Sequence, residues 1–464
     1  MRFQTMLLLL TTICCALLFS SCARLELSPE NLMDAPLLTS EQSAIREALF
    51  DGTRTRDVKF KYPKAGDYRS AFVMHDIDGD GKEEAIVFYD PQMGNANAMM
   101  GILVQTDEGW VFDYSIPGQG DSVELVQFGS MLEQGAENII VGWSRGGGEK
   151  TVAVYRYQPQ NSQDKLENLL TSSSGQYNEL MVYDFNRDGL TELLLLRTGS
   201  PEARLVSAGK ETGELDVSSK IELSGSISEI QRVKIGQLTS EIEAVFIDSR
   251  LQSGRFVTDI LKYEAESPRR MVNVISQYNK QLSGTDEEIE ENEINLKREQ
   301  RYYCEDIDGD GVMEIPYQPS ESSVLPGYSE DSDADKLYSA RYVRFDGERF
   351  EQVWYGVVNP DAGYRLEFPE QWMEGEVTVA AEVATGEWRF LEYGGSLAAS
   401  YRELLRINVV NRNSPPDKNA GEDQYKLLGS RGYYDYKVYY PAVLEDESFR
   451  VTESDIGRCF SLLP

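Results

Sequence analysis

Three short segments of the chain place oxygen-bearing side chains at the same spacing. Each has Asp or Asn at positions one, three and five, Gly at position six and Glu at position nine. Ca²⁺ takes about 6 to 8 oxygen ligands, alternate residues of a tight loop can point inward together, and glycine permits the sharp turn. We therefore predict three calcium sites, with the backbone carbonyl of position seven as a further ligand. The predicted ligands are Asp76, Asp78, Asp80, Lys82 and Glu84 in the first segment, Asp184, Asn186, Asp188, Leu190 and Glu192 in the second, and Asp306, Asp308, Asp310, Val312 and Glu314 in the third.

An EF-hand loop begins with the same spacing, but it ends in a bidentate Glu at position twelve and lies between two helices. Position twelve here is Val87, Leu195 or Tyr317. The residues on both sides of the first segment, 71–74 and 85–89, are rich in the apolar, β-branched and aromatic types that favour strands. The three segments are therefore predicted to connect strands.

The segments belong to a longer repeat that organises the middle of the chain. Five glutamates each begin an apolar, strand-like run: Glu84, Glu137, Glu192, Glu243 and Glu314. The runs recur roughly every 50 residues, and the longer last interval holds an acidic insertion at residues 284–299. Two of the runs lack the Asp cluster and follow residues 129–135 and 236–240 instead. This period fits one four-stranded propeller blade.

The arrangement of the five glutamates distinguishes two architectures. If each unit is one blade, every unit repeats the same strand order, and the five glutamates must lie on the same side of the assembly. If each pair of units forms one larger repeat whose halves pack as a sandwich, the glutamates would be split between opposed sheets.

The Asp-rich segments and their repeat resemble the FG-GAP or VCBS-type repeats of integrin-like β-propellers, whose blades carry calcium loops between adjacent strands. The resemblance covers about residues 68–357, and the nine-residue loop is its specific part. It implies calcium ligation by the Asp, Asn and Glu side chains of the three segments, in a mainly β fold with a propeller of four-stranded blades. Five units are visible. Such propellers often have seven, and residues 45–67 or part of the C-terminal region are candidates to complete the ring.

The N-terminal residues have the order of a lipoprotein export signal. Arg2 supplies a positive charge, residues 6–18 are uncharged and apolar, and small residues precede Cys22. The apolar run is shorter than the about 20 residues of a spanning helix, so we predict a signal peptide at residues 1–21. Residues 19–22, Phe-Ser-Ser-Cys, resemble the bacterial lipobox, although Phe replaces its usual Leu. This implies lipidation of Cys22 and an extracytoplasmic, membrane-anchored bacterial lipoprotein. An ordinary secretory leader is the alternative.

The net charge of the chain limits the kinds of partner that it can bind. The net charge of −33 repels the phosphates of nucleic acids and attracts divalent cations, so we predict no nucleic acid partner. Beyond Cys22, the sequence has two cysteines, Cys304 and Cys459. We predict two buried free thiols, and a disulfide between them is the alternative.

The flanks complete a division of the chain into four regions: a signal peptide (1–21), a tether and short helix (22–67), a propeller-like repeat domain (68–360) and a small α+β domain (361–464). A capping box at residues 39–42 begins the short helix, and Thr452 begins a closing helix over residues 453–462. The polar stretch 284–301 is predicted to be a solvated helix or a disordered loop, and residues 320–336 a long flexible insertion.

Most catalytic machinery is missing from the sequence. It contains one histidine, His75, which excludes sites built from several histidines. We favour a binding module for an unknown protein or glycan, with calcium holding the blades rigid. A propeller-scaffold hydrolase or lyase acting on envelope carbohydrate or peptide is an alternative, as is a structural or assembly lipoprotein.

Overall fold

Antiparallel strands make up most of the structure, a computed structural model in whose described residues three short helices accompany six sheets. It describes residues 38–463, except 92–96, 147, 162, 171–173, 210–213, 265–269, 283–295, 299–300, 318–324, 326–338, 373–376, 383–385, 401, 414–424 and 442–450. The predicted signal peptide, Cys22 and most of the tether lie outside the described residues, as do most of the acidic insertion and of the insertion at 320–336. The prediction of a mainly β fold is confirmed. No helix of the described chain has the length and apolar character needed to cross a membrane.

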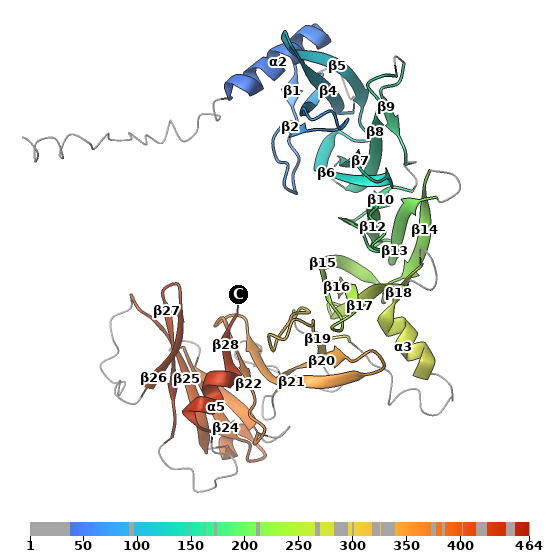
Figure 1. The fold of residues 1–464 in the computed structure, drawn as a ribbon. Helices are drawn as coiled ribbons and strands as arrows, with labels where there is room; N and C mark the ends of the chain where they lie inside the picture. The colour runs from blue at the N-terminus through green and yellow to red at the C-terminus, as the bar shows by residue number, and fades with distance from the viewer. Residues whose placement is uncertain are drawn as a thin grey trace, which may run out of the picture.

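Five sheets, numbered here one to five, follow one another in chain order through the repeat region (Figure 1). Sheet one contains β1 (Lys59–Phe60), β2 (Phe72–His75), β3 (Glu84–Asp90), β4 (Met99–Thr106) and β5 (Gly109–Pro117). Sheet two contains β6 (Ser122–Glu133), β7 (Ala136–Arg145), β8 (Glu149–Tyr157), β9 (Leu166–Asn168) and β10 (Gln176–Tyr177). In each of these two sheets, two short strands pair with the same edge of one longer strand. They are β1 and β2 on β3 in sheet one, and β9 and β10 on β8 in sheet two, so each sheet is four strands wide.

The remaining repeat sheets have the same antiparallel order. Sheet three contains β11 (Glu179–Tyr183), β12 (Glu192–Arg197), β13 (Glu202–Ala208) and β14 (Leu215–Glu222). Sheet four contains β15 (Ile227–Gln237), β16 (Glu243–Leu251), β17 (Phe256–Glu264) and β18 (Arg270–Asn273). Sheet five contains β19 (Ile315–Tyr317), β20 (Ser339–Phe345), β21 (Phe350–Asn359), β22 (Tyr364–Glu367) and, from the far end of the chain, β28 (Phe460–Leu462).

The sheets stack face to face because their central strands are apolar on both faces. In β12, Leu193 and Leu195 pack into one core with sheet two, while Leu194 and Leu196 pack into another with sheet four. All four leucines are completely buried, and burying one such side chain contributes about 1.5–3 kcal/mol. The period-two alternation of a strand thus joins each sheet to the one before it and the one after it.

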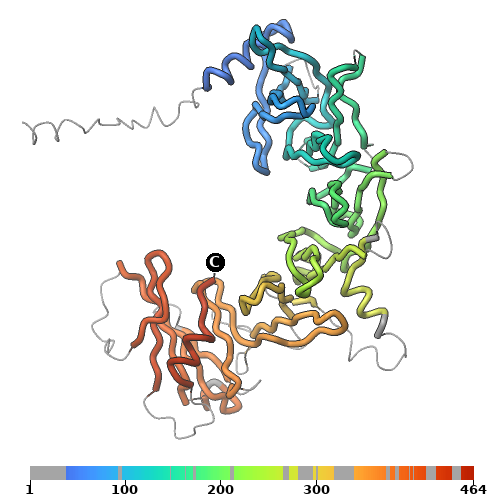
Figure 2. The backbone as a smooth tube through the Cα atoms, viewed as in Figure 1, coloured from blue at the N-terminus to red at the C-terminus, as the bar shows by residue number. Residues whose placement is uncertain are grey.

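The stack forms an open arc rather than a closed ring (Figures 1 and 2). Helix α2 (Ser40–Thr53) covers the outer face of sheet one, where its Ile45 and Leu49 pack against Leu103. The predicted capping box is present, since Thr39 Oγ1 accepts a hydrogen bond from the Gln42 N–H at 3.1 Å. In the described chain, this helix occupies the face against which a ring-closing sheet would pack.

The C-terminal part contributes a sixth sheet with β23 (Val377–Glu382), β24 (Glu387–Glu392), β25 (Glu403–Asn411), β27 (Tyr434–Tyr439) and β26 (Tyr425–Arg431), in that order. It also contains the 3-10 turn η2 (Leu397–Ala399) and α5 (Glu453–Cys459). The predicted closing helix was wrong in its last turn: the chain becomes extended at Phe460 and forms β28, because β22 offers an edge for pairing. The predicted boundary after residue 360 falls between two paired strands, β21 and β22.

The two cysteines of the described chain, Cys304 and Cys459, are not joined by a disulfide. Cys304 and Cys459 are both free, so the predicted free thiols are confirmed. Cys304 is buried, whereas Cys459 is partly exposed, which corrects the prediction that both are buried.

Candidate metal centres

Loop one (76–83), loop two (184–191) and loop three (306–313) occupy the same place in sheets one, three and five. Loop one joins β2 to β3, and loop two joins β11 to β12. Loop three precedes β19 and is closed by an antiparallel bridge between Glu305 and Glu314. Positions four and six of each loop have positive φ angles, from 57° at Arg187 to 92° at Gly311. Glycine occupies these positions except at Arg187, because residues with a Cβ rarely adopt this conformation.

Each loop brings three carboxylates to one place. The candidate ligand atoms of Asp76, Asp78 and Glu84 all lie within 4.8 Å of one another, and the same holds for Asp184, Asp188 and Glu192 and for Asp306, Asp308 and Glu314. Backbone N–H groups orient these carboxylates. The position-nine Glu accepts from the N–H of position two at 2.8–3.0 Å, and the position-one Asp accepts from the N–H of position six at 2.9–3.0 Å.

Not every predicted ligand belongs to these close groups. Asp80 and Asp310 lie outside them. Asn186 takes part through its amide, whose Nδ2 donates to Glu192 Oε1 at 2.5 Å and whose Oδ1 accepts from the Asp188 N–H at 2.8 Å. The N–H groups of Lys82, Leu190 and Val312 donate to the position-five carboxylates at 2.8–2.9 Å, and their carbonyl oxygens remain predicted ligands.

The position-nine glutamates are the most buried groups of the clusters. Glu84, Glu192 and Glu314 are 3%, 2% and 0% exposed. Burial, with a smaller contribution from the neighbouring Asp carboxylates, raises the pKa of each carboxyl to about 7. In the described residues, no lysine or arginine pairs with the carboxylates of loops one and two. A buried carboxylate needs a compensating charge, so these oxygen-only donor sets fit a hard divalent cation.

The pKa shifts predict opposite pH dependences with and without calcium. In the metal-free protein, each glutamate has a folded pKa of about 7 against an ordinary value of 4.5. Its contribution to stability is complete below pH 4.5 and is lost as the pH rises through 7. Calcium requires the ionised form, so its contribution grows over the same range. We expect the calcium-induced rise in melting temperature to be larger at about pH 8 than at about pH 6.

Thermal unfolding with excess calcium and with chelator at the two pH values measures this difference. Glu192→Gln should lose the part of the pH dependence that comes from loop two. An increment in melting temperature that is equal at both pH values would contradict the titration of these glutamates.

The three loops and the two turns without Asp clusters form one continuous row. The Thr191 N–H donates to Ser130 O at 2.8 Å, and Gln134 Nε2 donates to Asp188 O at 2.7 Å, which ties loop two to the turn of sheet two. The Met313 N–H donates to Gln237 O at 2.8 Å and ties loop three to sheet four.

The two remaining junctions of the row use the glutamates of sheets two and four. Glu137 pairs with His75 at the end of β2, and Glu243 Oε1 accepts from Tyr183 Oη at 2.8 Å. The His75 ring also stacks on Phe128, with 3.6 Å between ring centroids. These contacts join each of the five sheets to the next at the start of its glutamate-bearing strand, and they give His75 a structural role at a junction.

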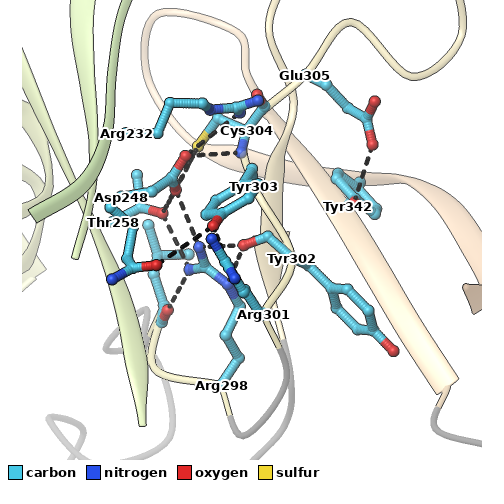
Figure 3. Close-up of polar contacts among 12 residues, drawn as sticks. Arg232, Asp248, Thr258, Arg298, Arg301, Tyr302, Tyr303, Cys304, Glu305 and Tyr342 are labelled. Atoms are coloured by element: carbon cyan, nitrogen blue, oxygen red, sulfur yellow. Dashed lines mark hydrogen bonds and ion pairs between the residues drawn. The ribbon is translucent and has the colours of Figure 1, made fainter. Parts of the chain in front are cut away.

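Sequence reasoning missed a buried polar cluster between sheets four and five (Figure 3). Arg298 is 0% exposed and donates to Asp248 Oδ1 at 2.9 Å and to Thr258 Oγ1 at 3.0 Å. Asp248 also accepts from the backbone N–H of Cys304 at 3.1 Å and from Arg232 at 3.3 Å. These residues come from β15, β16, β17 and the segment 298–304, which begins at the end of the acidic insertion.

A thiol beside a carboxylate suggests a nucleophile, but this cluster is structural. Cys304 is completely buried, and burial raises the pKa of its thiol well above the ordinary value. The prediction that residues 284–301 form a solvated segment was wrong at its described end. Arg298 pairs with Phe256 of β17 through two backbone hydrogen bonds of 2.7 and 2.8 Å, so it extends the edge of sheet four. The polar composition of this stretch gave no signal of that pairing.

No known family model matches the chain, and no curated protein matches it at a significant level.

Proposed function

We propose that this chain is a lipid-anchored, extracytoplasmic bacterial protein whose five stacked sheets are the blades of an open, propeller-type module stabilised by calcium. One observation carries the proposal: loops one and two each gather two aspartates around a buried glutamate, and no basic side chain of the described chain pairs with these carboxylates. Calcium supplies the missing positive charge when it binds, and the loop residues hold and orient it. The resemblance of these loops to FG-GAP and VCBS-type repeats supports the same identification.

The module is proposed to bind a protein or a glycan of the cell envelope rather than to catalyse a reaction. Sheets stacked along an arc present an extended surface, and repeat proteins use such surfaces for recognition. His75 is engaged with Glu137 and Phe128, and the Cys304 thiol is enclosed. The net charge of −33 argues against nucleic acid as the partner.

Protein isolated from native membranes tests both parts of the proposal. We expect its N-terminal residue to be an acylated Cys22, seen by intact mass, and its calcium content to be stoichiometric, seen by elemental analysis. Cys22→Ala should lose partition into detergent and keep its calcium, because the anchor and the loops are independent. An unmodified N-terminus elsewhere would overturn the anchor, and native protein without calcium would overturn the stabilised module.

A further inference from the structure

Among the three loops, only the carboxylates of loop three contact an arginine in the described chain. The guanidinium of Arg344, in β20, contacts Asp308 Oδ2 at 2.5 Å, Asp310 Oδ2 at 2.8 Å and Glu314 Oε1 at 3.1 Å. These are the carboxylates of positions three, five and nine, three of the predicted calcium ligands. An arginine therefore already holds the oxygens that a cation would draw together.

The strand register explains why this happens in sheet five alone. Ile315 pairs with Val343, so Glu314 lies opposite Arg344 on the next strand. By the same register, Glu84 lies opposite Val104 in sheet one. Directly opposed residues on neighbouring antiparallel strands share one face and lie within about 4.5–5.5 Å at Cβ, which allows the long Arg344 side chain to reach loop three.

The corresponding residue in sheet three is Ser207, opposite Glu192. Valine and serine carry no charge, so the neighbouring strand supplies no cation to the carboxylates of loops one and two. In loop three, the guanidinium of Arg344 offsets part of the carboxylate charge. Calcium needs its oxygen ligands arranged around one ion at about 2.3–2.6 Å. A planar guanidinium instead binds carboxylate oxygens at separate N–H donors, which keeps those oxygens apart.

A guanidinium and Ca²⁺ cannot share these oxygens without mutual repulsion. We propose that Arg344 takes the place of calcium in loop three, so that the protein binds two calcium ions where its three Asp-rich loops predict three. This inference rests on the proposed calcium function of loops one and two. It also makes the junction between sheets four and five independent of calcium, while the junction between sheets two and three depends on it.

The test is the calcium stoichiometry of the full chain, measured by isothermal titration and by elemental analysis after dialysis against defined free calcium. We expect two ions per wild-type chain and three per chain of the Arg344→Ser variant. This substitution introduces the residue type that sheet three has at the equivalent position, Ser207. Arg349→Ser is the charge-matched control, because Arg349 is 69% exposed and contacts Asp346 and Glu351 instead of loop three. This control should bind two ions.

The outcomes separate the inference from the proposed function. Three ions in the wild type, or two in a folded Arg344→Ser variant, would overturn the role of Arg344 while leaving calcium binding intact. No ion in the wild type would overturn the proposed function and the inference with it. If Arg344→Ser does not fold, Arg344→Gln replaces it, since glutamine keeps a long polar side chain and removes only the charge. Three ions are then expected for this variant.

Discussion

The Asp248→Ala variant is expected to lose about 3–5 kcal/mol of unfolding free energy, because removing one partner of a buried ion pair leaves the other charge uncompensated. Arg298 would remain completely buried without its carboxylate partner, and the Cys304 N–H would lose its acceptor. The loss should appear as a lower midpoint in chemical denaturation, followed by circular dichroism.

An exposed ion pair on sheet two provides the matched control. Arg156 pairs with Glu167 across β8 and β9, and the two side chains are 42% and 49% exposed. Glu167→Ala should cost less than about 1 kcal/mol, because exposed pairs are screened by solvent. If Asp248→Ala were no more destabilising than Glu167→Ala, the buried cluster would not hold sheets four and five together.

Chelation of calcium is expected to have an effect of similar size. A ligand that binds only the folded state stabilises it by about 2.7 kcal/mol per site at a hundredfold excess over its dissociation constant. Two filled loops therefore contribute about 5 kcal/mol. We expect a chelator to lower the melting temperature clearly, and magnesium to restore it poorly because it demands a tighter octahedral geometry.

The variant Asp184→Asn with Asp188→Asn should remove about half of this calcium effect, because it disables loop two alone. Asp107→Asn with Glu108→Gln, two acidic residues in the turn between β4 and β5, should leave the calcium effect unchanged. A melting curve that does not respond to chelator would rule out a stabilising metal in either loop.

The repeat and its loops could be predicted because their signals are local. Alternating Asp residues with glycine at position six identify a tight loop without knowledge of the rest of the fold. The apolar runs after Glu84 and Glu192 identify central strands, even though the leucines of β12 favour helices intrinsically. Burial between two neighbouring sheets outweighs that preference.

The features that were missed depend on contacts between distant parts of the chain. Arg344 lies opposite Glu314 only because β20 pairs with β19 across residues 318–338, whose composition gives no signal of that pairing. Arg298 pairs with Asp248, 50 residues earlier. The open arc depends on α2, whose amphipathic sequence shows that it packs on a sheet but not on which one. Spacing and periodicity carry no information about such contacts.

The edge of β17 bears on how this protein tolerates change in length. Its end pairs with β18 at Leu261 and Asn273, its start pairs with Arg298 through Phe256, and most of the acidic insertion lies between these attachments. Between these attachments, α3 (Val274–Leu282) and Leu296 pack into the core between sheets four and five. We therefore expect changes of length between Leu282 and Leu296 to be tolerated, because the entropic cost of closing a loop rises by only about 0.6 kcal/mol for each doubling of its length. A reporter domain grafted there should leave the five sheets intact, whereas replacing α3 would remove part of their core.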